Sequence, residues 1–88
     1  MTDAELDRLR AEVADADREI LGLVNRRLGV VGAIRAHKRA LGLPFLDPGQ
    51  EERLLARLRD ENGGPLSAEG VERLFREILD LVKHELES

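Results

Sequence analysis

The sequence predicts an all-α protein with three helices per chain, one very long and two shorter, in an intertwined homodimeric helical bundle. Apolar residues recur at helical spacing, two groups of Gly and Pro interrupt the pattern, and aromatic residues are almost absent. Phe45 and Phe75 are the aromatic residues, 2% of an 88-residue chain. Because strands favour aromatic and β-branched side chains, a core of Leu, Val, Ile and Ala suits helices better than a sheet. We expect a single domain, residues 1–88.

The first predicted helix covers residues 3–41. Thr2 and Glu5 form a predicted capping box at its start, and Gly42 and Pro44 end it. Its apolar residues alternate spacings of three and four, which indicates one helical face with a coiled-coil-like seam. The seam consists of Leu6, Leu9, Val13, Ala16, Ile20, Leu23, Val30, Ile34 and Leu41.

Two shorter helices are predicted to follow, over residues 48–61 and 68–86. The first of these has Asp47 as N-cap, Pro48 as first helical residue and Gln50 completing a capping box. Its narrow apolar face consists of Leu54, Leu55 and Leu58. The last helix begins after the cap Ser67 and has a wide apolar face made of Val71, Leu74, Phe75, Ile78, Leu81, Val82 and Leu86.

The length of the first helix predicts the dimer. Such a helix is about 58 Å long at about 1.5 Å per residue, whereas a compact domain of this size has a radius of gyration of about 12 Å. Because two short helices cannot cover so long a seam, we expect a second copy to bury it.

Charge and composition exclude several classes of function. The net charge is −4, with neither a basic surplus nor stacking aromatics, so we expect no nucleic-acid partner. The absence of cysteine excludes disulfides, thiolate metal sites and cysteine nucleophiles. No apolar run approaches the ~20 residues of a membrane span. The acidic start also lacks the apolar segment of a signal peptide, so we expect a cytoplasmic protein without a membrane partner.

Polar residues on the apolar seam are the candidates for function. Arg27 occupies a seam position, and Lys38 lies eleven residues later on the same stripe, because eleven residues make about three turns. Cations that face a core are costly unless they are paired. Together with Arg10 beside the seam, and Asp47 and Glu51 near the start of the next helix, they could form a pocket for a small polyanion.

Each of these residues also has a structural interpretation, which the pattern alone leaves open. Arg27 could form a dimer salt bridge, and Lys38 could complement the helix dipole. Asp47 could act only as an N-cap, and Glu51 is an ordinary first-turn acid. His37 and His84 lack partners at metal-ligand spacing, and no nucleophile or phosphate-loop motif is present, so we expect neither metal nor cofactor.

In these residues the sequence resembles the all-helical (AroQ-type) chorismate mutases. The resemblance runs over about residues 6–58 without a gap, and more loosely over the third helix. It rests on Leu9-Arg10, Val13, Asp17, Ile20, Leu23, Arg27, Ile34, Lys38, Asp47 and Glu51-Glu52-Arg53. It implies a homodimer that takes chorismate as substrate and rearranges it to prephenate, on the path to Phe and Tyr.

The resemblance also implies a role for each matching residue. Arg27 and Arg10 of the partner subunit would bind the two substrate carboxylates. Lys38 would donate to the ether oxygen, where negative charge builds as the C–O bond breaks. Glu51 would bind the substrate hydroxyl, assisted by the backbone near Asp47. Asp17 looks structural, and the apolar pocket walls would be Ile34 and Leu79.

The third helix departs from the family pattern. With Leu74-Phe75 as anchor, Val82 and Leu86 occupy the positions where the family usually has a Ser and then a Gln or Glu facing the substrate. A second donor to the ether oxygen is then missing. A register shift in the preceding loop could instead bring in Glu85 or Glu87, which would have to be protonated to donate, so activity would rise toward acid pH.

This departure leaves alternatives to an efficient mutase. The chain could be a non-catalytic regulatory remnant of the fold, or an enzyme activated by a partner enzyme of the same pathway. It could also be an isochorismate pyruvate-lyase, which resembles the mutases and uses a similar cationic pocket. Identification of the product distinguishes the lyase from the mutase.

Overall fold

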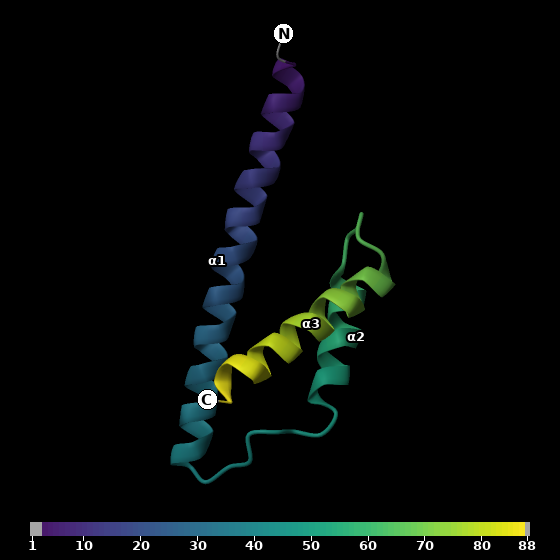
Figure 1. Cartoon of the computed structure of the whole chain (residues 1–88). Coiled ribbons are helices and arrows are strands. Elements are labelled where there is room, and N and C mark those ends of the chain that lie inside the picture. The colour runs from purple at the N-terminus through teal and green to yellow at the C-terminus, as the bar shows by residue number, and fades with distance from the viewer. Residues whose placement is uncertain (1–2, 88) are drawn as a thin grey trace. The chain divides into compact units, whose positions relative to one another are not determined.

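The computed structural model describes residues 3–87 as three helices (Figure 1). They are α1 (Ala4–Ala40), α2 (Gln50–Glu61) and α3 (Ala68–Leu86), and no strand is present among the described residues. The prediction of one very long helix and two shorter ones is therefore confirmed. The chain divides within α1 into two units, Met1–Val31 and Gly32–Ser88, and the second unit contains α2, α3 and the last turns of α1.

Backbone and side-chain caps define both ends of α1. The Oδ1 atom of Asp3 accepts a hydrogen bond from the Leu6 N–H at 3.1 Å. The predicted cap Thr2 lies outside the described residues. At the other end, the Leu43 N–H donates to the Lys38 carbonyl at 2.8 Å and the Gly42 N–H to Arg39 at 3.1 Å. With Gly42 at φ +70°, this is a Schellman motif, so the predicted end at Gly42 is confirmed.

The predicted start of α2 was wrong. The N-cap is Gly49, in a left-handed conformation with φ 85° and without a side-chain cap, rather than Asp47. Pro48 and Gly49 form a turn that closes with a hydrogen bond from the Gln50 N–H to the Asp47 carbonyl at 3.0 Å. Because this turn delays the helix, Asp47 precedes the cap and Pro48 is not its first residue. Asp47 therefore contributes its backbone carbonyl to this turn.

The start of α3 is the predicted one. The Oγ atom of Ser67 accepts a hydrogen bond from the Gly70 N–H at 2.9 Å, as an N-cap does. Asn62 organises the preceding loop, because its Oδ1 accepts from the Gly64 N–H at 3.1 Å and its Nδ2 donates to the Leu66 carbonyl at 2.6 Å. These local bonds set where α3 begins.

The buried core lies where α2 and α3 pack against each other (Figure 1). Leu55 of α2 is fully buried, and Val71 and Val82 of α3 are nearly so. Ion pairs also cross this interface. Arg59 of α2 pairs with Glu72 of α3 at 3.6 Å, and Arg76 of α3 pairs with Glu52 of α2 at 3.3 Å. Many large apolar side chains remain exposed, including Leu6, Leu9, Val13, Ile20, Leu23, Val30, Ile34, Leu74 and Leu81. None of the described helices is long and apolar enough to cross a membrane.

We expect Leu55→Ala to be the most destabilising truncation of an apolar side chain in α2. Leu55 has no exposed surface, so its loss removes buried apolar area and leaves a cavity, which costs about 2–5 kcal/mol in the free energy of unfolding. Urea denaturation monitored by circular dichroism measures this. Leu21→Ala, at a side chain that is 63% exposed, is the control and should stay within about 0.5 kcal/mol. Equal stabilities for the two variants would contradict the assignment of the core.

Candidate functional site

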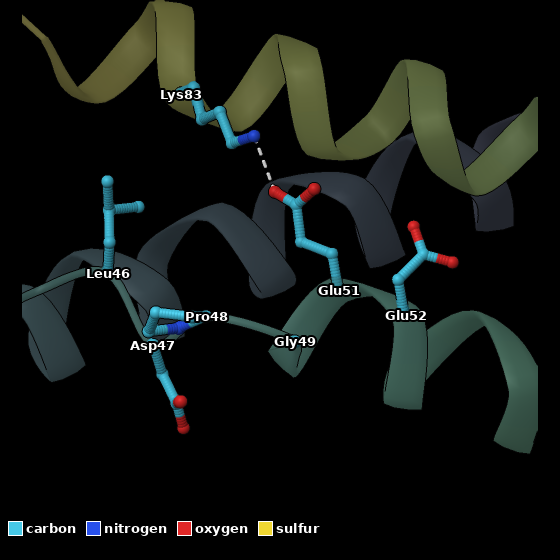
Figure 2. Close-up of a pocket in the computed structure, with 7 residues that line it drawn as sticks. All are labelled: Leu46, Asp47, Pro48, Gly49, Glu51, Glu52 and Lys83. Atoms are coloured by element: carbon cyan, nitrogen blue, oxygen red, sulfur yellow. Dashed lines mark ion pairs between the residues drawn. The ribbon is translucent and has the colours of Figure 1, made fainter.

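A hollow of about 420 Å³ lies at the start of α2 (Figure 2). The loop before α2 and the first turn of that helix form one side, and the last turns of α3 form the other. Its lining residues are Leu46, Asp47, Pro48, Gly49, Glu51, Glu52 and Lys83. The structure thus brings together Asp47 and Glu51, two of the predicted site residues.

An ion pair between Glu51 and Lys83 spans this hollow. The Nζ atom of Lys83 contacts the Oε1 atom of Glu51, and the dashed line in Figure 2 marks this contact. Both side chains are about half-exposed. The hydrogen bond to Glu51 raises the pKa of Lys83 above its usual range, against the smaller opposing effect of burial. Glu51 lies in the first turn of α2 and Lys83 in the last turn of α3, where the helix dipoles favour a negative and a positive charge respectively.

Lys83 is the site residue that the sequence reasoning missed. It lies next to Val82 in a helix with a strongly apolar face, and nothing in its local pattern marks it as functional. Its partner belongs to another helix, so only the packing of α3 on α2 brings the two charges together. A cation in the last turn of a helix is the weak signal that was present, and the helix dipole already explains such a residue.

The carboxylate of Asp47 points away from the Glu51–Lys83 pair (Figure 2). Its Oδ2 atom accepts a hydrogen bond from Nη2 of Arg53 at 3.1 Å, and the same nitrogen donates to Oε1 of Gln50 at 3.0 Å. The Asp47 side chain is therefore bound to Arg53, a residue of the same stretch of chain. Backbone groups near Asp47 remain the part of this turn that could serve a ligand.

Lys38 lies in the last turn of α1 and is half-buried. Its Nζ atom donates to the Phe45 carbonyl at 3.3 Å and lies 6.0 Å from the centroid of the Phe45 ring. Arg35 lies 5.2 Å from the same centroid, and its guanidinium contacts the Leu86 carbonyl. An ammonium has three N–H donors, and the Phe45 carbonyl takes one of them. Lys38 is not among the residues that line the hollow of Figure 2.

Arg27 belongs to the unit Met1–Val31 and carries an unusual polar atom. Its Nη1 is buried and has no hydrogen-bond partner among the described residues. A shallow hollow of about 300 Å³ adjoins it, lined by Leu23, Arg26, Arg27 and Val30. A buried charged donor without an acceptor costs free energy, so this guanidinium favours an anionic acceptor supplied from outside the chain. Arg10, in the same unit, is exposed and forms no ion pair within residues 3–87.

The predicted apolar site residues differ in their surroundings. Ile34 is about half-exposed, and Leu79 is half-buried. Val82 belongs to the buried core of α2 and α3, and Leu86 packs against Gly32, whose added Cβ would lie 3.8 Å from Leu86 Cδ2. A second hollow of about 280 Å³ is lined by Arg35, Phe45, Leu46, Lys83 and Glu87. Contact between a substrate and the predicted apolar residues Ile34, Leu79, Val82 and Leu86 stays a prediction.

Comparison with known proteins identifies what the chain is similar to. Residues 9–86 match the family chorismate mutase type II. A solved structure of chorismate mutase (form II) from Thermus thermophilus is 38% identical, with 96% of this chain and 98% of that chain covered and a TM-score of 0.86. Form I from the same organism is 41% identical, with 89% and 98% covered and a TM-score of 0.84. Among curated proteins, no sequence gives a significant match.

Proposed function

The chain belongs to the chorismate mutase type II family, and from this premise we propose how it converts chorismate to prephenate. The reaction is an isomerisation in which one C–O bond breaks and one C–C bond forms, with no change in protons or electrons. The single observation that carries this function is the family match over residues 9–86, which includes Arg27, Lys38 and Glu51. We propose that the product, prephenate, is used in the synthesis of Phe and Tyr.

The arginines hold the two carboxylates of the substrate in this mechanism. Arg27 supplies one guanidinium, and its buried, unpartnered Nη1 supports a role in binding an anion. Arg10 of the partner subunit supplies the other, which makes the site composite. Guanidinium groups suit this task because they bind carboxylates with two parallel hydrogen bonds. The two arginines hold the substrate in the compact conformation from which it reacts. Much of the substrate's conformational entropy is therefore lost on binding, before the chemical step.

Lys38 and Glu51 act on the reacting part of the substrate. Lys38 donates a hydrogen bond to the ether oxygen, which becomes more negative as the C–O bond lengthens. This interaction is stronger in the transition state than in the ground state, so it raises the rate. Glu51 accepts a hydrogen bond from the substrate hydroxyl. The hollow at the start of α2 supports this role, because Glu51 lines it from the first helical turn.

We also propose that two copies pair through α1. The exposed seam from Leu6 to Ile34 supports this, since a stable chain buries most such side chains and this one buries few. Pairing would also bring Arg10 of the partner subunit to each site. Light scattering on the purified protein tests the proposal, and a stable, well-folded monomer would overturn it.

The decisive experiment measures chorismate consumption by ultraviolet absorbance, with identification of the product. Prephenate formation by the wild-type protein would support the mutase, whereas pyruvate release from isochorismate would identify a lyase.

A well-folded dimer without turnover would favour the regulatory or partner-activated alternative. That second candidate draws on one observation: Val82 lies in the core and Leu86 packs on Gly32, so neither position supplies a polar donor. If this non-catalytic protein still binds prephenate, adding prephenate should raise the melting temperature of the protein.

A further inference from the structure

Lys83 is the one cation of α3 that lines the hollow of the candidate site. It reaches from the last turn of α3 to Oε1 of Glu51 in the first turn of α2 (Figure 2). Among the described residues Lys83 is the sole ion-pair partner of Glu51, and its closest contact is with Oε1. A carboxylate has about four acceptor lone pairs, so the ion pair leaves acceptor capacity on Glu51 for a ligand.

The geometry restricts a side chain that would otherwise move freely. A Glu side chain in a first helical turn has several rotamers, and fixing one costs conformational entropy. An ion pair to a neighbouring helix reduces this freedom before the substrate binds. An ionised carboxylate accepts hydrogen bonds and does not donate them. An acceptor is what a substrate hydroxyl requires.

We propose that Lys83 is a positioning residue for the mutase reaction, which holds the Glu51 carboxylate so that Oε2 accepts the hydrogen bond of the substrate hydroxyl. This inference rests on the proposed function and assigns to α3 a role that neither Val82 nor Leu86 can fill. Lys83 acts through Glu51 and does not touch the substrate. Because binding of the hydroxyl persists from ground state to transition state, loss of Lys83 weakens substrate binding more than it slows the chemical step.

A second ion pair across the same helices provides a matched control. Arg59 of α2 pairs with Glu72 of α3 at 3.6 Å, with exposures similar to those of the Lys83–Glu51 pair. Neither residue lines the hollow. If Lys83 only joined α3 to α2, Lys83→Met would leave substrate binding unchanged, as Arg59→Met should, although Glu72 still pairs with Arg76 at 2.8 Å when Arg59 is replaced. A role in positioning predicts that the two variants differ in substrate binding while their stabilities stay similar.

The experiment compares steady-state kinetics of the full chain with chorismate. For Lys83→Met we expect KM to rise about tenfold with kcat within about threefold of wild type, whereas Arg59→Met keeps both constants. Lys83→Arg retains the charge and should restore KM to within about threefold. In a Glu51→Gln background, Lys83→Met should add less than about twofold, because the residue through which it acts is already altered. Lys83→Gln repeats the test if the Met variant does not fold.

Each other outcome overturns the inference. A wild-type KM for Lys83→Met, an equal rise for Arg59→Met, or an additive effect in the Glu51→Gln background would show that Lys83 does not position Glu51. These results leave the mutase function intact, because the wild-type protein still forms prephenate. A wild-type protein that forms no prephenate would overturn the proposed function and, with it, the role of Lys83.

Discussion

Lys38→Ala should lower kcat for the conversion of chorismate to prephenate by about 10²–10³, which corresponds to ~2.7–4 kcal/mol of transition-state stabilisation. The reaction exchanges no proton and uses no nucleophile, so the enzyme must stabilise charge where it develops. Lys38 is the cation proposed to meet the ether oxygen. Its Nζ is already oriented by the Phe45 carbonyl at 3.3 Å, which reduces the reorganisation needed in the transition state.

Arg39→Ala is the matched control for this variant. Arg39 follows Lys38 in the last turn of α1, is exposed, and carries the same charge. Its removal should leave kcat unchanged and reduce stability only by the ~0.3–1 kcal/mol of a helix-dipole interaction. Both variants should elute from size-exclusion chromatography at the same volume as the wild-type protein. Turnover by Lys38→Ala at the wild-type rate would rule out the role assigned to Lys38.

Arg27→Ala should lower kcat/KM by at least about 10²-fold and leave the folded state intact. The guanidinium is proposed to bind a substrate carboxylate, and its Nη1 has no acceptor within the described residues. Removal of a buried donor that lacks a partner relieves a desolvation cost, so the free energy of unfolding should not fall as it does for a paired residue. Kinetics together with urea denaturation separates loss of activity from loss of fold.

Two further variants sharpen the test of Arg27. Arg27→Lys keeps the charge but not the paired donors, so it should recover only a small part of the activity. Arg26→Ala removes the neighbouring exposed arginine that lines the same shallow hollow, and it should behave as wild type. Equal losses for Arg26→Ala and Arg27→Ala would indicate a general electrostatic effect and contradict a specific clamp.

The helices could be predicted from the sequence because their signals are local. Three- and four-residue spacing marks the apolar faces, and the cap at Ser67 and the left-handed Gly42 depend on a few neighbouring residues. Dependence on local signals also explains why the start of α2 was misassigned. Asp47 and Pro48 both have the chemistry of a helix start, but the Pro48–Gly49 turn competes with the helix for these residues.

The family, the three helices, and the candidates Arg27, Lys38 and Glu51 could all be identified from the amino-acid sequence. The helices follow from residue types at regular intervals, which helical geometry turns into shared faces. The family follows from the resemblance of an ordered set of residues to a known motif. Which charges meet, and which apolar residues are buried, depends on how the helices pack and could not be predicted from local patterns. Val82 enters the core and Lys83 pairs with Glu51 because α3 packs on α2 in one orientation. Adjacent residues on a helix point about 100° apart, so only that orientation separates a core position from a site position.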